Sequence, residues 1–220
     1  AVDEMSGALV LDEFLESQPK RVHKSYRKLA KVAREAYPIG VPALIMKSST
    51  DRLGASAGYS FHLGTPDDIL RRIASWLITN AKDNQDTLWK LIPELWSRHG
   101  REDVALSALL LANLDHEAVG TDPWDLLASS INSMEPADAL LLSIEEVLRA
   151  GYGGPSEEQY RSWCSGRKVQ NHLALISAFA SQNSGTVVPP EIISLLLEVE
   201  IPDGDSLLGR IRDRFSNLKP

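Results

Sequence analysis

The chain has 220 residues, of which 43% are hydrophobic, and a formal net charge of −7. This length can bury a core as one domain or two small ones. No apolar run approaches the roughly 18 to 20 residues of a membrane-spanning helix, and the acidic net charge argues mildly against nucleic acid as a partner. Cys164 is the single cysteine, so no intrachain disulfide can form. No apolar signal-peptide core is visible, so we expect a cytoplasmic protein.

Helical periodicity dominates the chain, and the alternating pattern of strands is rare. We therefore predict a series of antiparallel helices separated by loops at 48–64, 151–155 and 182–186. The predicted helices, in chain order, cover residues 9–16, 20–36, 42–47, 66–77, 88–96, 104–114, 123–131, 135–150, a segment that starts after Ser156, 172–180, 190–199 and 206–215. Thr65, Asp122 and Ser156 are the predicted N-caps, with Pro66 and Pro123 at the first helical position.

The segment 88–114 gives the clearest pattern. Leu88, Leu91, Ile92 and Leu95 recur at i, i+3, i+4 and i+7, and the residues from Val104 onward are apolar around most of the helix. A polar turn at 97–100 joins these two helices. Helices recur about every 20 residues and pairs about every 40, a period typical of HEAT or armadillo arrays. We predict an all-α superhelix of HEAT-like repeats over 1–220 as a single domain, with an irregular all-α bundle as the alternative.

Two blocks of sequence resemble one family. The first contains Glu94, Leu95 and Trp96 followed, after the turn, by Arg101, Glu102, Asp103, Ala105, Leu106 and Ala108, and the second runs over 26–47. Together they are similar to the HEAT-like DNA alkylation repair family, the AlkD-type DNA glycosylases, over about half of the chain. The resemblance implies a helical-repeat fold, duplex DNA as the partner, and excision of N3- or N7-alkylated purines.

The resemblance is weaker where the family has its active site. Asp138 matches the second family carboxylate if one residue is inserted, but Met134 and Glu135 replace the family's tryptophans. A later family Trp and Arg correspond to Trp163 and His172, so the arginine is missing. The resemblance therefore makes Asp138 the candidate catalytic residue and Trp163 and His172 candidate DNA-binding residues. It leaves open whether the chain is an enzyme.

These candidates have a physical rationale. Cleavage of the bond between a sugar and a cationic base builds positive charge on the sugar, which a carboxylate such as Asp138 can stabilise. An aromatic ring such as Trp163 or Trp124 can stack on the cationic base. The alternatives are that Asp138 is an ordinary carboxylate at a helix start and that Trp163 is a core residue.

A basic stripe is the strongest charge pattern. Residues 20–34 hold seven Lys or Arg and no acid. Lys20, Lys24, Arg27, Lys31 and Arg34 are spaced by four, three, four and three residues, which puts them on one face of a helix. We interpret the stripe as a phosphate-contacting surface. The alternative is a solvated face balanced by Asp12, Glu13 and Glu16 of the preceding helix.

The sequence contains no motif for metal binding, nucleotide binding or serine-based catalysis. The histidines and Cys164 lack the spacing of metal ligands, no phosphate-binding glycine motif follows a strand, and no serine-nucleophile motif occurs, so we predict neither metal nor cofactor. His99 is expected to pair with Glu102 or Asp103, or else to lie exposed in a turn. Three functions compete: a DNA-binding glycosylase, a HEAT-like DNA-binding protein without catalysis, and a protein-binding scaffold. We expect a monomer with no membrane association.

Overall fold

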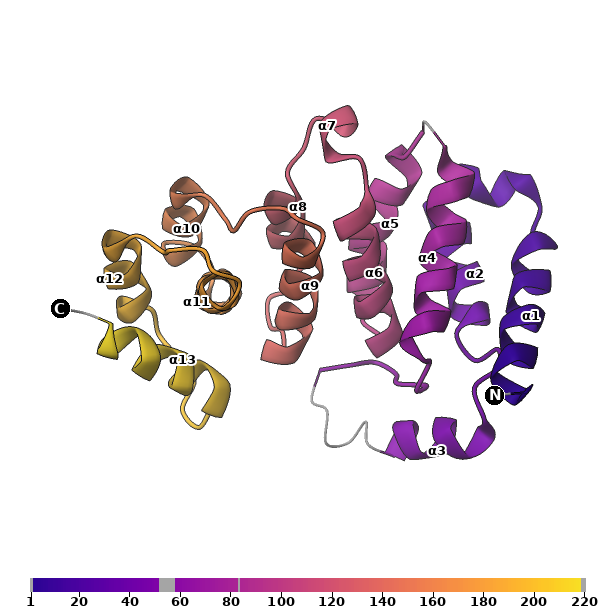
Figure 1. Cartoon of the computed structure of the whole chain (residues 1–220), viewed down its shortest axis with the longest axis horizontal. Helices are drawn as coiled ribbons and strands as arrows, with labels where there is room; N and C mark the ends of the chain where they lie inside the picture. The colour runs from indigo at the N-terminus through magenta and orange to yellow at the C-terminus, as the bar shows by residue number, and fades with distance from the viewer. Residues whose placement is uncertain (1, 52–57, 83, 219–220) are drawn as a thin grey trace. The chain divides into compact units, whose positions relative to one another are not determined.

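The computed structural model describes residues 2–51, 58–82 and 84–218. Within these ranges the chain forms thirteen α helices and one 3₁₀ helix, η1, and no strand (Figure 1). The prediction of an all-α protein is therefore confirmed. None of the described helices is both long and apolar enough to cross a membrane.

The helices divide into two compact units, 1–120 and 121–220, and each is described by itself. The prediction of one HEAT-like superhelix over the whole chain stays a prediction. The first unit contains α1 (Val2–Glu16), η1 (Lys20–Lys24), α2 (Tyr26–Ala36), α3 (Ala43–Asp51), α4 (Asp67–Ala81), α5 (Asp86–Arg98), α6 (Arg101–Asn113) and α7 (His116–Val119). The second contains α8 (Pro123–Ser130), α9 (Ala137–Arg149), α10 (Glu157–Cys164), α11 (Lys168–Asn183), α12 (Pro190–Glu198) and α13 (Ser206–Asn217).

The core of the first unit is the predicted pair of helices α5 and α6. Leu88, Leu91, Ile92 and Leu95 of α5 are buried, and each such side chain contributes about 1.5 to 3 kcal/mol when fully removed from water. Helix α6 is buried from Glu102 to Ala112, as its apolar circumference predicts. Helix α2 packs on α5 and α4 packs on α6, so α2 has only its outer side free.

The predicted continuous helix over 20–36 is wrong. Ser25 adopts an extended conformation, with φ −139° and ψ 112°, and separates η1 from α2. Its hydroxyl accepts a hydrogen bond from the Lys28 backbone N–H, so Ser25 is the N-cap of α2. The N-cap preference of serine outweighs the continuous helical pattern of cations and apolar residues.

Several other boundaries differ from the predictions. Helix α1 begins at Val2 rather than Leu9, and α3 extends to Asp51, into the predicted loop over 48–64. Residues 52–57 of that loop lie outside the described residues. Helix α4 has Pro66 as its N-cap, because the Thr65 hydroxyl donates to the Tyr37 carbonyl instead of capping the helix. The short helix α7 has no counterpart among the predicted elements.

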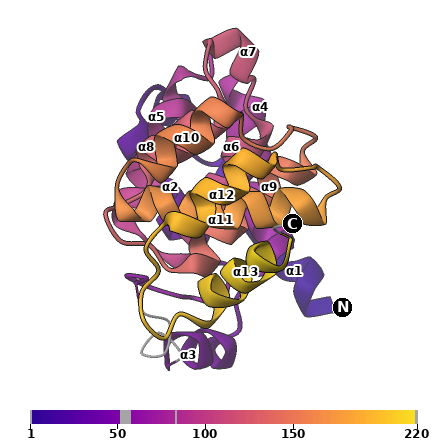
Figure 2. The same cartoon turned by 90° about the vertical axis from the view of Figure 1, so that its left-hand side faces the viewer.

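The second unit is built around α11. In Figure 1 this helix is seen end-on, and it packs against α9, α10 and α13; Figure 2 shows its length. It starts at Lys168, earlier than the predicted His172. The predicted caps are confirmed at two other helices. Asp122 accepts from the first backbone N–H groups of α8, and Ser156 forms the capping box of α10.

Candidate nucleic-acid interface

The basic face lies in the first unit, on η1 and α2. It consists of Lys20 and Lys24 on η1 and of Arg27, Lys31 and Arg34 on α2. The three α2 cations are at i, i+4 and i+7 and share the outer side of the helix, while the inner side is buried. Because the helix breaks at Ser25, the five cations do not share one helix. All five still belong to one continuous segment, residues 20–34.

The cations of the basic face form no ion pair within the part of the chain that the structure describes. Among the described residues, no ion pair involves any of the five side chains. Asp12 binds Arg72 of α4 at 2.8 Å, and neither Glu13 nor Glu16 pairs with the basic face. Direct ion pairs between these cations and the described acids of α1 are therefore absent. Like charges at i, i+4 cost about 0.2 to 0.5 kcal/mol per pair, so the face is unfavourable for folding alone.

Charge is distributed unevenly between the two units. Residues 1–120 contain 15 Lys and Arg against 16 Asp and Glu, whereas residues 121–220 contain 8 against 14. The acid excess of the chain belongs mainly to the second unit. The acidic total of the chain therefore does not describe the local field around the basic face.

Arg34 of the basic face and Arg101 of α6 both rest on aromatic rings. The Arg34 guanidinium lies over the Phe61 ring, 4.5 Å from its centre, and the Arg101 guanidinium lies 5.9 Å from the centre of the Tyr59 ring. The Arg101 backbone N–H also donates to the Phe61 carbonyl at 2.8 Å. Sequence reasoning missed Arg101, because no spacing connects it to Tyr59.

A buried ionic cluster anchors α2 to the turn between α5 and α6. Asp103 is fully buried and accepts hydrogen bonds from the Tyr37 hydroxyl (2.8 Å), from two nitrogens of Arg98 (2.6 and 2.9 Å) and from the Gly100 N–H (3.1 Å). Arg98 Nη1 donates to the Ala30 carbonyl of α2 at 2.7 Å. Burial, and next the charge of Asp103, raise the pKa of the Tyr37 hydroxyl well above its ordinary value. The segment that carries the family resemblance thus has a structural role.

His99 lies in the interior of the first unit rather than exposed in the turn. It ends α5 with φ 62°, is buried, and stacks on Tyr59 with ring centres 5.5 Å apart. The Glu102 carboxylate accepts from the Leu63 and Thr65 backbone N–H groups, and Asp103 serves the cluster described above. The expectation of an exposed turn histidine is therefore wrong, and the expected pairing of His99 with Glu102 or Asp103 stays a prediction.

Gly100 gives a first prediction about this turn. A Cβ at this position would lie 2.1 Å from the Phe61 ring, so the ring would have to leave its place. Because the Gly100 φ of −70° suits any residue, the effect would be steric. We expect Gly100→Ala to lower the free energy of unfolding by about 1 to 2 kcal/mol. Denaturant titration measures this. Gly153→Ala, where nothing lies within 4 Å, is the control, and equal stability of the two variants would contradict the prediction.

The second unit holds the other predicted site residues. Asp138 is exposed in the first turn of α9. Trp163 is only 3% exposed and makes T-shaped contacts with Trp124 at 6.5 Å and Tyr160 at 6.2 Å, so its ring is a core residue. The ring has no exposed face to offer a base in this structure.

His172 is half-buried and lines a cavity of about 290 Å³. Glu135 and Ala137, which flank the start of α9, line the same cavity, whereas Asp138 does not. Lys168 also lines it and pairs with Glu200 at 3.3 Å. The structure thus brings His172 close to the start of α9 but leaves Trp163 elsewhere in the core.

The burial of His172 predicts a dependence of stability on pH. Desolvation lowers the pKa of its imidazole below 6.5. The unfolded chain then binds the proton more readily than the folded one, so the stability that this group contributes is complete above pH 6.5 and is lost as the pH falls through the folded-state value. We expect His172→Gln to flatten the loss of unfolding free energy between about pH 7 and 5. Urea titrations across that range measure it, and parallel pH profiles would contradict it.

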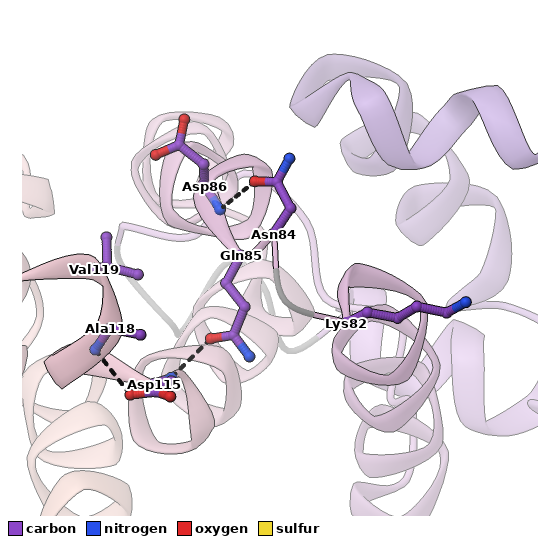
Figure 3. A pocket seen from close by; sticks show the side chains of 7 residues that line it. All are labelled: Lys82, Asn84, Gln85, Asp86, Asp115, Ala118 and Val119. Atoms are coloured by element: carbon purple, nitrogen blue, oxygen red, sulfur yellow. Dashed lines mark hydrogen bonds between the residues drawn. The ribbon is translucent and has the colours of Figure 1, made fainter.

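A second cavity, of about 440 Å³, lies in the first unit between the loop before α5 and helix α7 (Figure 3). In Figure 3 the Gln85 amide points toward Asp115 while Lys82 extends away. The Gln85 side-chain oxygen accepts from the Asp115 N–H at 2.7 Å, and the Asp115 carboxylate accepts from the Ala118 N–H at 3.0 Å. These hydrogen bonds connect the loop before α5 to the start of α7. The residues that line this cavity do not form a catalytic set.

No group of three or more His, Cys, Asp or Glu side chains in the described part of the chain could hold a metal ion. Comparisons of the chain with protein-family models, with curated proteins and with solved structures find no match. The class of protein therefore rests on fold and surface: an all-helical protein whose first unit presents a basic face that forms no ion pair with the described residues.

Proposed function

We propose that this chain is a DNA-binding helical protein whose basic face holds the sugar–phosphate backbone of duplex DNA. The observation that carries the proposal is the row of five exposed or half-exposed cations without an ion pair in the described residues. Such cations gain affinity for DNA by releasing the counterions condensed on phosphates. Arginine adds a planar fork that fits two phosphate oxygens.

The length of α2 supports a contact that follows the backbone. Its 11 residues span about 16 Å at 1.5 Å per residue. Each DNA strand carries one phosphate per about 3.4 Å of the duplex axis, so a helix of this length that lies along the axis spans about five phosphates of one strand. Several cations along a helix of this length can bind the regularly spaced charges of a polyanion, whereas a single acidic side chain could pair with only one of them.

The helical pair α5 and α6 supports the finer proposal of HEAT-like repeats, because such pairs are the unit of helical arrays. The alternative function is a catalytically inactive scaffold for protein partners. An acidic protein would also meet a basic face, but it would not offer phosphates at a regular spacing.

Comparison of two polyanions tests the proposal. The full chain is titrated, with fluorescence anisotropy as the readout, into labelled duplex DNA of about 20 base pairs and into labelled polyglutamate at about 50 mM salt. We expect dissociation constants for DNA on the order of 10⁻⁶ to 10⁻⁴ M at physiological salt and tighter binding at about 50 mM, independent of the DNA sequence, and weaker binding of polyglutamate. Stronger binding of polyglutamate would favour the protein scaffold, and no binding of DNA would overturn the proposal.

Excision of alkylated purines is the reaction that the family resemblance implies. The second unit offers Asp138 as an exposed carboxylate, but Trp163 and Trp124, its nearest aromatic candidates in sequence, are 3% and 2% exposed. We therefore propose binding without excision. Release of 7-methylguanine from alkylated DNA should be no faster with the protein than in buffer, and Asp138→Asn should change nothing. Release that requires Asp138 would overturn this part of the proposal.

A further inference from the structure

We infer that the DNA contact extends beyond α2 to Arg101 of α6, and that the Phe61 ring positions Arg34 within it. The inference rests on the proposed function of the basic face. It adds one binding residue from a different helix and one positioning residue from a loop, and neither belongs to the stripe that the sequence predicts.

The loop segment from Tyr59 to Phe61 forms a fixed support. Its Ser60 N–H donates to the His99 carbonyl at 2.8 Å, and the Ser60 hydroxyl donates to the Arg98 carbonyl at 2.6 Å. The Phe61 carbonyl accepts from the Arg101 N–H. These three bonds fasten the segment to the turn between α5 and α6, so the rings of Tyr59 and Phe61 are held in place.

Arg34 and Arg101 lie on the two rings of this segment with their donors available. Among the described residues, neither side chain has an ion pair or a hydrogen bond. A guanidinium stacked on a ring keeps its N–H groups in its plane, where they can bind two oxygens of one phosphate. Both arginines are half-exposed, so the stacked position leaves their edges accessible.

Arg98 is excluded as a contact, although it lies beside the same Phe61 ring. Its Nε and Nη2 donate to Asp103 and its Nη1 donates to Ala30. Its role is to hold the turn against α2, which brings the support for Arg101 next to the helix that carries Arg34.

The covered rings favour a phosphate partner over unpaired bases. The Phe61 ring has Arg34 over it, and its atoms lie within 2.5 Å of where a Gly100 Cβ would be. Tyr59 is buried between His99 and Arg101. Single-strand binding relies on open aromatic faces on which bases stack. These rings are occupied, which favours a phosphate backbone over unpaired bases as the partner of this surface.

Salt-dependent binding of duplex DNA to matched variants tests the inference. Arg101→Gln should reduce the slope of log affinity against log salt by about 0.9, the value for one phosphate contact. Arg71→Gln, an exposed cation of α4 outside this surface, is the control and should leave the slope unchanged. Circular dichroism and thermal unfolding establish that each variant is folded at the temperature of the titration.

Positioning is tested separately from charge. Phe61→Leu and Arg34→Lys each keep the charge of the surface, so the salt slope should stay near that of the unmodified chain while the affinity falls about threefold to tenfold. A purely structural role of Phe61 would lower the melting temperature and leave the affinity of the folded protein intact. Arg34→Lys changes no packed ring, so it remains informative if Phe61→Leu fails to fold.

The outcomes separate the two claims. No binding of duplex DNA by the unmodified chain would overturn both. Binding with an unchanged slope in Arg101→Gln would overturn the extension to α6 and leave the basic face of α2 intact. Unchanged affinity in folded Phe61→Leu and in Arg34→Lys would overturn the positioning role of the ring.

Discussion

Reversal of three charges on the basic face, Lys24→Glu, Arg27→Glu and Lys31→Glu together, should weaken duplex DNA binding by at least about a hundredfold at about 100 mM salt. All three side chains are exposed, so the variant should fold normally. Each lost phosphate contact removes about 0.9 from the salt slope, which gives a decrease of nearly three. The added carboxylates also repel the phosphates.

Reversal of three exposed cations elsewhere in the first unit provides the matched control. Arg71, Lys82 and Lys90 lie outside the basic face, and their replacement by glutamate changes the net charge by the same amount. If this control weakens binding as much as the triple reversal on the basic face does, only the net charge matters. That result would contradict a localised contact.

Removal of the Asp103 carboxylate should have the largest effect on stability. Asp103→Ala leaves the partly buried Arg98 guanidinium, the Tyr37 hydroxyl and the Gly100 N–H without their acceptor. Breaking a buried ion pair by removing one partner costs about 3 to 5 kcal/mol, so we expect a loss near about 3 kcal/mol in the free energy of unfolding. For a chain of this size, that corresponds to a melting temperature lower by roughly 10 °C.

Two comparisons make the Asp103 prediction specific. Tyr37→Phe removes one hydrogen bond and should cost about 1 kcal/mol. Asp67→Ala removes an exposed pair with Arg71, which should cost less than about 1 kcal/mol. Chemical denaturation of the three variants measures the differences. An Asp103→Ala variant as stable as Asp67→Ala would contradict the anchoring role of the cluster.

Local sequence signals predict much of the helical framework. The sequence predicts the α5 and α6 pair because apolar residues recur with the period of a helix over a long segment. The caps at Asp122 and Ser156 are predicted because a side chain, a backbone N–H and a fixed spacing suffice to define them. These features depend on residues that are neighbours in the chain.

The break at Ser25 and the surroundings of Arg101 could not be predicted in the same way. A serine inside a continuous amphipathic pattern is compatible with a helix interior, and only the packed structure decides that it is a cap. The stacking of Arg34 on Phe61 joins residues 27 positions apart, and the Tyr37 to Asp103 bond joins residues 66 apart. Pattern reasoning along one chain does not reach such contacts.

The predicted site residues also differ in whether they depend on local pattern or on tertiary packing. The stripe of cations is a local pattern, and on η1 and α2 its side chains are exposed or half-exposed and form no ion pair with the described residues. Trp163 depends on tertiary packing, and burial against Trp124 and Tyr160 removes its ring from the surface. The catalytic role of Asp138 and the DNA contact of His172 stay predictions.

The salt dependence of duplex DNA binding by the unmodified chain is the most direct test of the central claim. If the basic face contacts about five phosphates, the slope of log affinity against log salt should lie near about −4.5, and affinity should fall steeply between about 50 and 200 mM salt. Absence of binding at the lowest salt, or an affinity that does not change across this range, would contradict the assignment of the basic face to the DNA backbone.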